Sequence, residues 1–302
     1  MKIGIVTVTY NSEHVLADFL SSLDQQDYNN VLTIFIDNAS KDKTLNAIKS
    51  WKNTSKILIE NKHNAGVAAG NNQGIKLALA NDCQFILLLN NDTVFEPQLL
   101  SKLINAHINY GSSLVVPKMN YFNPKDIIWY AGGFFNPSKG FLNYHRGQGV
   151  LDQNQYNQDD VVEYAPTCCV LIHKKVFEDV GLMDERYFVY FDDTDFFYRV
   201  KHHSKHELRY IHRVEFFHKI GSLSKSRTDD KSHFYSPFFI HQNCKNHMYF
   251  LKKQRRMITP LLLMYIWFYH TLRFFFSSNF EKKWKTLILI QTSLIEGLRM
   301  RL

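Results

Sequence analysis

The chain has 302 residues, enough to bury a large core and to form one large domain or two. Its content of 45% hydrophobic and 21% charged residues is ordinary for a globular protein and excludes a disordered chain. The formal net charge of +8 is unevenly placed, because residues 241–302 contain 11 Lys or Arg and two acidic residues, whereas the first 240 contain 25 basic and 26 acidic residues.

The cysteines and the N-terminus bear on the compartment. The four cysteines form no CxxC pair and no metal-ligand spacing, which indicates a reducing environment. The first strand-like run is interrupted early by Asn11, Ser12 and Glu13, unlike a signal peptide. We therefore expect a cytoplasmic protein.

Strand-like and helix-like runs alternate over the first half of the chain. Residues 85–89 are five consecutive apolar residues without polar alternation, which predicts a central strand covered on both faces. This alternation predicts parallel βαβ units and a Rossmann-like, nucleotide-binding half over residues 1–117. The other expected strands are 3–9, 31–36, 56–59 and 113–117.

Polar residues follow each of the first four strands, where open α/β sheets bind their ligands. Tyr10 and Asn11 follow the first strand, and Asn64 follows the third. Asp37, after the second strand, is placed to bind a base or ribose, or else it caps the next helix. Asp92, after the fourth strand, is a candidate metal ligand, the alternative being an Asx-turn or a helix cap.

The run of small residues over 65–74 opens a helix that could approach a ligand closely. It contains neither GxGxxG nor GxxxxGK[ST], so a dinucleotide fingerprint and a P-loop are both absent from the sequence.

Residues 118–230 follow a different pattern, which predicts an acceptor-binding and catalytic half. Turn dipeptides and aromatics over 121–158 predict loops and short antiparallel strands at an acceptor-side lip. A short helix is expected to end at Gly181.

An acidic and aromatic cluster over 184–199 contains a candidate general base. Asp192, Asp193 and Asp195 stand beside aromatic residues that include Tyr190, and such surroundings raise a carboxyl pKa. The alternative is a helix N-terminus whose acids complement the helix dipole. Downstream, His218 ends an apolar strand and precedes a loop.

Four motifs together resemble family 2 of the inverting, nucleotide-sugar-dependent glycosyltransferases with the GT-A fold, and within it the rhamnosyl- and galactofuranosyltransferase-like branch. They are residues 7–11 (TVTYN), 37–42 (DNASKD), 90–92 (NND) and 191–195 (FDDTD) with His218. The resemblance covers roughly residues 3–250 and implies a mainly parallel α/β sheet flanked by helices.

The resemblance also implies roles for individual residues. Asp193 matches the catalytic base, and Asp92 and His218 match ligands of Mg²⁺ or Mn²⁺. The acceptor-side candidates are Asp192, Asp195 and Tyr190. The implied nucleotide-sugar contacts are Thr9, Tyr10, Asn11, Asp37, Asn38, Asn64, Gly66, Asn72 and Asn91.

Residues 231–302 are expected to form a helical, basic and aromatic region. The uninterrupted apolar run 261–269 is too short to span a bilayer, which takes about 20 residues. Aromatic residues and basic flanks over 244–302 predict contact with an anionic membrane surface, and the apolar content argues against nucleic acid. The alternative is packing on the catalytic body or on a second subunit.

The sequence therefore predicts a metal-dependent inverting glycosyltransferase on the inner face of the cytoplasmic membrane. Its donor would be a UDP- or dTDP-sugar, and its acceptor a polyprenyl-diphosphate-linked saccharide of a surface polysaccharide such as O-antigen or capsule. Two alternatives are a catalytically inactive nucleotide-sugar-binding scaffold and a sugar nucleotidyltransferase, the latter disfavoured because no Gly-rich triphosphate loop follows the first strand.

Overall fold

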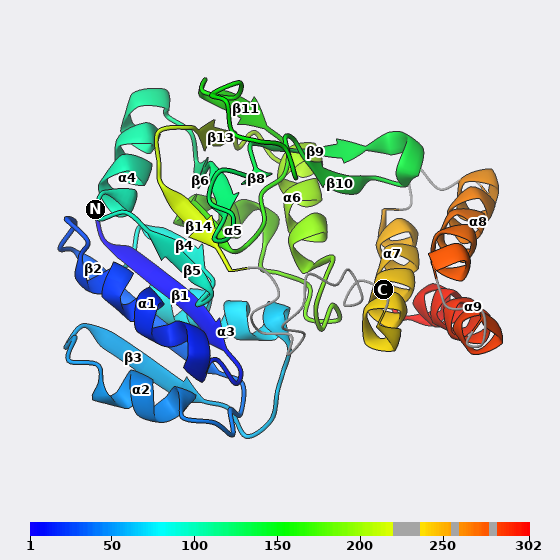
Figure 1. Cartoon of the computed structure of the whole chain (residues 1–302), viewed down its shortest axis with the longest axis horizontal. Coiled ribbons are helices and arrows are strands. Elements are labelled where there is room, and N and C mark those ends of the chain that lie inside the picture. Colours follow the sequence, from blue (N-terminus) through cyan, green and yellow to red (C-terminus); the bar gives the residue numbers. More distant parts are fainter. Residues whose placement is uncertain (220–235, 255–259, 278–282) are drawn as a thin grey trace.

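A computed structural model describes residues 1–219, 236–254, 260–277 and 283–302 (Figure 1). In these residues the main sheet has eight strands in the order β11-β13-β6-β12-β4-β1-β2-β3. In chain order they are β1 (Ile3–Thr9), β2 (Val31–Asp37), β3 (Lys56–Glu60), β4 (Phe85–Leu89), β6 (Leu114–Pro117), β11 (Asp160–Val162), β12 (Cys169–His173) and β13 (Leu208–Ile211).

The first half of the sheet is parallel, as predicted. β1 pairs in parallel with β2 and β4, and β2 with β3. β4 is central, because its other edge pairs with β12, and all five of its residues are buried. Each buried leucine or isoleucine there stabilises the fold by about 2 kcal/mol. Because β12 is antiparallel to its neighbours, the sheet as a whole is mixed. The fold class is still α/β, as predicted.

A second, smaller sheet brings distant segments together. Its order is β5-β14-β7-β8, and β14 pairs with β5 so that His218 lies opposite Thr93. The hairpin β9–β10 lies beyond it, and β7 and β8 confirm the short antiparallel strands expected in this region. The elements are β5 (Thr93–Phe95), β7 (Met119–Tyr121), β8 (Ile128–Tyr130), β9 (Gly133–Asn136), η1 (Pro137–Lys139), β10 (Leu142–His145) and β14 (Phe216–His218).

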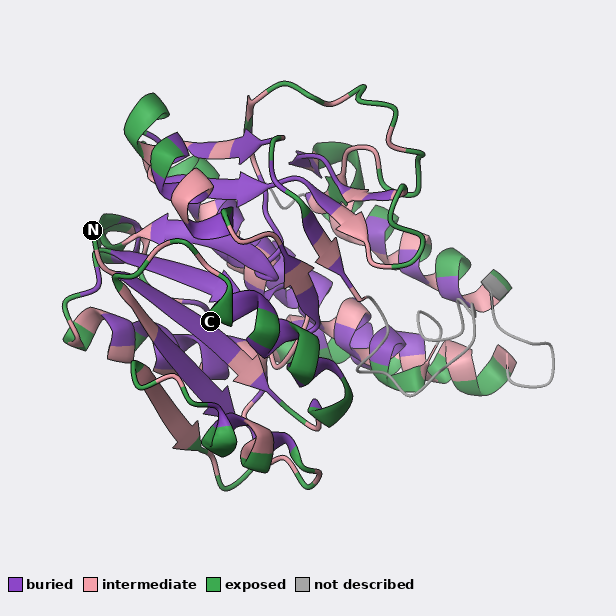
Figure 2. Ribbon diagram, turned by 60° about the vertical axis from the view of Figure 1, so that its left-hand side comes forward, coloured by how far each residue is buried: buried purple, intermediate pink, exposed green. Residues whose placement is uncertain are grey.

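Helices cover the sheet, and Figure 2 shows its central strands buried, whereas the edge strand β3 has intermediate burial. In α3, a Cβ at Gly74 would lie 2.2 Å from Val6, and one at Gly70 2.9 Å from Val8. These small residues therefore let α3 approach β1, rather than a ligand as the sequence suggested. The helices of the catalytic body are α1 (Glu13–Asp24), α2 (Thr44–Ser50), α3 (Val67–Ala80), α4 (Leu99–Tyr110), α5 (Lys174–Val180) and α6 (Asp192–His203).

Three helices follow at the end of the molecule opposite β3 (Figure 1): α7 (Pro237–Lys253), α8 (Pro260–Ser277) and α9 (Lys283–Arg299). α7 belongs to the body, since Asn246 donates hydrogen bonds to the carbonyls of Val189 and Tyr190. The domain boundary expected near residue 230 lies outside the described residues. None of the described helices combines the length and apolar content that a membrane span needs.

Candidate active site

The carboxyl ends of β1 and β2 meet, as their parallel register requires. Thr9 lies opposite Asp37, and its hydroxyl donates to Asp37 Oδ1 at 2.9 Å. Ser40 also donates to both oxygens of Asp37, through its hydroxyl at 2.5 Å and its backbone N–H at 2.8 Å. Thr9 and Asp37 are fully buried. Both therefore brace the turn that follows β2.

The other predicted nucleotide-binding residues near this turn differ in how far their side chains are exposed to solvent. Tyr10 is 46% exposed and is free to pack on a base. Asn11 fixes the same turn, because its Oδ1 accepts from the Lys41 N–H and its own N–H donates to Ser40. Asn38 is buried and donates to the carbonyl of Gly66. Tyr10 is thus the exposed side chain of this group.

The residues at the start of α3 that were predicted to contact the nucleotide-sugar hold the loop that leads to the acidic cluster. Asn64 accepts from the N–H of Gly66, whose φ of +87° suits glycine. A Cβ there would lie 2.4 Å from the carbonyl oxygen of Phe188. Buried Asn72 donates to the carbonyl of Met183 and to Glu185. Gly66 and Asn72 therefore position residues 183–188 against the N-terminal half of the chain.

Asp92 and His218 form the candidate metal pair. β14 lies beside β5, and the Lys219 N–H donates to the Asp92 carbonyl, which brings His218 Nε2 to 3.2 Å from Asp92 Oδ1. Neighbouring ligand atoms of an octahedral Mg²⁺ lie about 3.0 Å apart, given metal–oxygen distances of about 2.1 Å. Asp92 Oδ1 is buried and has no hydrogen-bond partner in the described chain. The pair therefore fits two ligands of a divalent cation.

The rest of a coordination sphere would have to come from the donor and from water. No group of three or more His, Cys, Asp or Glu in the described residues could hold a metal. Asn91 donates to the Val8 carbonyl and to Ser12, while its buried Oδ1 has no partner among the described groups. That oxygen is a further polar group at the same edge.

Asp193 is the second residue of α6, and both of its oxygens accept hydrogen bonds. Oδ2 accepts from the Tyr164 hydroxyl at 2.5 Å, and Oδ1 accepts from the Thr194 N–H at 2.7 Å. Burial raises the pKa of Asp193, although the Tyr164 and Thr194 hydrogen bonds oppose this rise. Burial, and then the Asp193 charge, raise the pKa of Asp192 well above its usual value. A raised carboxyl pKa suits a general base.

The metal pair and the base lie near each other. Burial raises the pKa of the Cys168 thiol, and the charges of both Asp92 and Asp193 add to that rise. Both carboxylates therefore lie within electrostatic range of the same buried thiol, which directly precedes β12.

The loop before α6 is strained at its last two positions. Tyr190 has φ of 63° and Phe191 φ of 70°, a region that non-glycine residues rarely adopt. Asn246 holds the carbonyl of Tyr190, and His247 stacks on Phe191 at 5.2 Å. α7 therefore maintains the backbone that presents Asp193.

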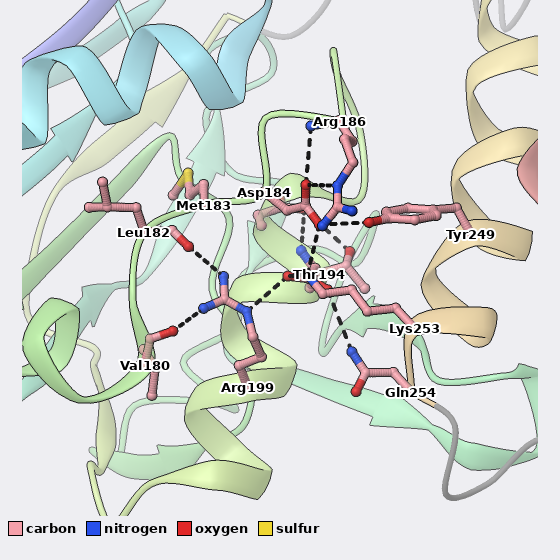
Figure 3. Close-up of polar contacts among 12 residues, drawn as sticks. Val180, Leu182, Met183, Asp184, Arg186, Thr194, Arg199, Tyr249, Lys253 and Gln254 are labelled. Atoms are coloured by element: carbon pink, nitrogen blue, oxygen red, sulfur yellow. Dashed lines mark hydrogen bonds and ion pairs between the residues drawn. The ribbon is translucent and has the colours of Figure 1, made fainter. Parts of the chain in front are cut away.

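Asp195 lies in a separate polar network, drawn in Figure 3. It is fully buried, and its Oδ2 accepts from Arg199 at 2.9 Å and from Lys253 at 2.9 Å. Lys253 also binds Asp184, which accepts from Arg186 as well. This arrangement speaks against the predicted acceptor contact at Asp195, because its oxygens are bound within the protein.

We expect Asp184→Asn to destabilise the protein by about 2 kcal/mol at neutral pH, since charged hydrogen bonds are worth about that much. Burial would raise the pKa of Asp184, but the hydrogen bonds from Arg186 and Lys253 more than offset it and hold the pKa well below its usual range. A depressed pKa contributes stability above about pH 4, which is lost as the pH falls. Denaturant unfolding at pH 7 and pH 3 measures both effects.

The matched control is Asp179→Asn, because Asp179 is 62% exposed and, among the described residues, pairs with His206 alone. Exposed pairs contribute less than about 1 kcal/mol. Equal losses in the two variants, or an Asp184→Asn loss that does not shrink at pH 3, would contradict the assignment.

Three residues of the site were missed from the sequence. Tyr164 binds Asp193, Trp129 packs on His218 with ring centroids 4.4 Å apart, and His145 stacks on Tyr164 at 5.8 Å. Trp129 and His145 lie in residues 121–158, which were expected to form loops and short antiparallel strands at an acceptor-side lip. Its clustered aromatics were the available signal, and nothing in the sequence singles out Tyr164.

The arrangement defines the class of protein: an α/β chain with the GT-A fold. The structure resembles TarS residues 1–349 of Staphylococcus aureus in complex with UDP-GlcNAc, with a TM-score of 0.61, 16% identity, and coverage of 99% of this chain and 82% of that one. It also resembles the mannosyltransferase PcManGT of Pyrobaculum calidifontis in complex with GDP-Man and Mn²⁺, with a TM-score of 0.56, 12% identity, and coverage of 100% and 76%.

The sequence profile of Glycosyl transferase family 2 matches residues 4–181, more than half of the chain, so the protein belongs to that family. Low-salt glycan biosynthesis hexosyltransferase Agl10 of Haloferax volcanii is 25% identical over 206 residues, which are 66% of this chain and 61% of that protein. An uncharacterized glycosyltransferase of Rickettsia typhi is 25% identical over 236 residues, 76% of this chain and 64% of its own. The chain thus spans less than two thirds of either relative.

Proposed function

We propose that this protein transfers one sugar from a UDP- or dTDP-linked donor to a saccharide acceptor, with inversion and with Mg²⁺ or Mn²⁺. The observation that carries the proposal is a continuous row of contacts from the Asp92–His218 pair to Asp193, which runs through Trp129, His145 and Tyr164. Solved structures of the same fold hold UDP-GlcNAc or GDP-Man with Mn²⁺, which supports a nucleotide-sugar donor.

The nucleotide-binding half, residues 1–117, would hold the nucleotide at the carboxyl ends of β1 and β2. Tyr10 offers an exposed ring for the base, and the braced turn at Asp37 and Asn38 offers a rigid edge for the ribose. Asp92 and His218 would hold the cation, which when bound neutralises charge on the departing diphosphate.

Asp193 would act as the base. Its carboxylate takes the proton of an acceptor hydroxyl while that oxygen forms a bond to the anomeric carbon. The bond from that carbon to the diphosphate breaks, and its electron pair leaves with the nucleoside diphosphate. Tyr164 and Thr194 fix the carboxylate during this step. One displacement inverts the configuration without an enzyme nucleophile.

The donor sugar and the pathway belong to the proposal as well. Rhamnose, galactofuranose or a similar sugar, added to a polyprenyl-linked saccharide of O-antigen or capsule, is the finer expectation from the sequence motifs. The named relatives are a hexosyltransferase and an N-acetylglucosaminyltransferase, so they do not single out that branch.

A panel of UDP-, dTDP- and GDP-sugars tests the function by the release of nucleoside diphosphate, with and without chelator. We expect release with one donor and its loss on chelation. No release with any donor that nevertheless binds would favour the inactive scaffold, and release of pyrophosphate from a nucleoside triphosphate would favour the nucleotidyltransferase.

We further propose that α8 and α9 attach the protein to an anionic membrane surface. The described part of these helices and the C-terminus carries five basic residues and one acidic residue. α8 exposes one apolar face and α9 another, each at helical spacing, as interfacial helices do. The residues are Leu261, Met264, Phe268, Leu272 and Phe276, then Trp284, Ile288 and Ile295, with exposures of 38–77%.

The double variant Phe268→Glu/Leu272→Glu should lose binding to vesicles that contain phosphatidylglycerol, because two charges would enter the apolar face. Co-sedimentation should fall at least about tenfold. Ile108→Glu is the control, since Ile108 is 58% exposed on α4, away from this face. If wild-type protein does not bind the vesicles and light scattering shows a dimer, the apolar face contacts a second copy of the chain instead.

A further inference from the structure

A continuous row of ring contacts joins the metal pair to the base. Trp129 lies 4.4 Å from the His218 ring and 4.9 Å from the His145 ring, measured between centroids. His145 stacks on Tyr164 at 5.8 Å with the planes 24° apart, and Tyr164 donates to Asp193. We name Trp129, His145 and Tyr164 the aromatic wall.

His145 has a defined tautomer in this wall. Its Nδ1 lies 3.2 Å from the carbonyl oxygen of Trp129, which can only accept, so Nδ1 carries the proton. Burial is the largest cause that lowers the pKa of His145 to about 4, and the ring is therefore neutral near pH 7. In a neutral ring protonated at Nδ1, Nε2 is a hydrogen-bond acceptor.

That acceptor nitrogen is unused in the described structure. No described group bonds His145 Nε2, and it is not one of the fully buried unpaired atoms. The wall thus offers one accepting nitrogen beside the partly exposed Trp129 ring. A sugar supplies the matching chemistry, with a hydroxyl that donates and an apolar C–H face that packs on an aromatic ring.

We propose that the aromatic wall is a sugar-binding subsite in which His145 Nε2 accepts a hydrogen bond from a hydroxyl of the acceptor saccharide. The inference rests on the proposed function, because it takes Asp193 as the base. The reacting hydroxyl must reach Asp193, so the acceptor ring lies beside Tyr164, on which His145 stacks. The Trp129 end of the wall adjoins the metal pair, where the donor diphosphate would lie.

The test compares His145→Phe with wild type, using a panel of n-octyl glycosides as acceptors. Phenylalanine keeps a ring in the wall and removes only the accepting nitrogen. Saturation-transfer NMR should show glycoside binding to wild type and at least tenfold weaker binding to the variant. The kcat/KM for the glycoside should fall about 10- to 100-fold, a larger loss than that of nucleoside diphosphate release to water.

His107→Phe is the matched control, because His107 also bonds a backbone carbonyl through Nδ1, at 2.9 Å from Ser112 O, but lies on α4. His145→Gln, which restores an acceptor atom, should regain part of the binding. Monodeoxy glycosides then identify the hydroxyl, since one of them should bind wild type and His145→Phe equally.

The outcomes separate the subsite from the function. Glycoside binding that is absent in wild type, or unchanged in His145→Phe, overturns the subsite while donor turnover still supports the glycosyltransferase. An equal loss of hydrolysis and transfer would place His145 on the donor sugar and overturn the proposal. Glycoside binding lost only in His145→Phe, without turnover of any donor, would overturn the proposed function and keep the subsite.

Discussion

Asp193→Asn should reduce kcat for sugar transfer about 10³-fold, because an amide cannot take the proton from the attacking hydroxyl. The substitution keeps the shape of the side chain, so Oδ1 can still accept from the Thr194 N–H. Binding of the nucleoside diphosphate should be unchanged, since Asp193 is proposed to act on the acceptor. Single-turnover transfer and calorimetric titration of the nucleotide measure the two quantities separately.

Two variants control for a general disturbance of α6. Asp195→Asn changes a carboxylate two residues away that binds Arg199 and Lys253 instead of Tyr164. The folded variant should therefore keep its activity within about tenfold. Tyr164→Phe removes a hydrogen bond that opposes the raised pKa of Asp193. The rise of activity with pH should therefore move to higher pH. Asp193→Asn with more than a tenth of wild-type turnover would exclude Asp193 as the base.

The N-terminal half of the fold could be predicted because each of its strands is marked by an apolar run that is local in the sequence. β1 and β4 have the bounds expected from their apolar runs, and β2 and β3 extend one residue further. Each is followed by polar residues at one sheet edge, as parallel topology requires. The pairing of β14 with β5 is different, since it joins His218 to Thr93 across more than a hundred residues. No local pattern fixes such a register.

The acidic cluster shows what helix geometry adds to composition. Asp193 and Asp195 are two positions apart in α6, so their side chains point about 200° apart around the helix axis. One faces Tyr164 and the other faces Lys253. Their separation could have been inferred once α6 was placed at Asp192. The partners could not, because Tyr164 and Lys253 come from distant segments.

The glycine-containing opening of α3 was interpreted from the sequence as allowing close approach to a ligand. Small residues permit close approach to a ligand or to a strand. In the structure Gly70 and Gly74 serve the strand, since Val8 and Val6 fill the space where their Cβ atoms would lie. Of these three glycines, Gly66 alone combines a positive φ with a close neighbour, the carbonyl of Phe188. Close packing therefore explains most of the motif that had suggested a nucleotide contact.

Asp92→Ala should lower transfer about 10²- to 10³-fold, the loss typical of removing one electrostatic stabiliser of a departing anion. Asp92 supplies the only charged oxygen of the pair, and His218 alone offers one nitrogen. Calorimetric titration of nucleoside diphosphate with and without Mn²⁺ measures the cation directly. In wild type, Mn²⁺ should tighten nucleotide binding at least about tenfold, and Asp92→Ala should abolish that difference.

Asp92→Asn and His218→Ala separate charge from coordination. The amide keeps an oxygen at the same place without its charge, so Asp92→Asn should retain more Mn²⁺ dependence than Asp92→Ala. His218→Ala leaves the carboxylate in place and should lose less activity than Asp92→Ala, because a hard cation prefers oxygen ligands. If Mn²⁺ does not change the affinity of wild type for the nucleotide, this pair is excluded as a cation site. The 3.2 Å separation would then be only a carboxylate–imidazole contact.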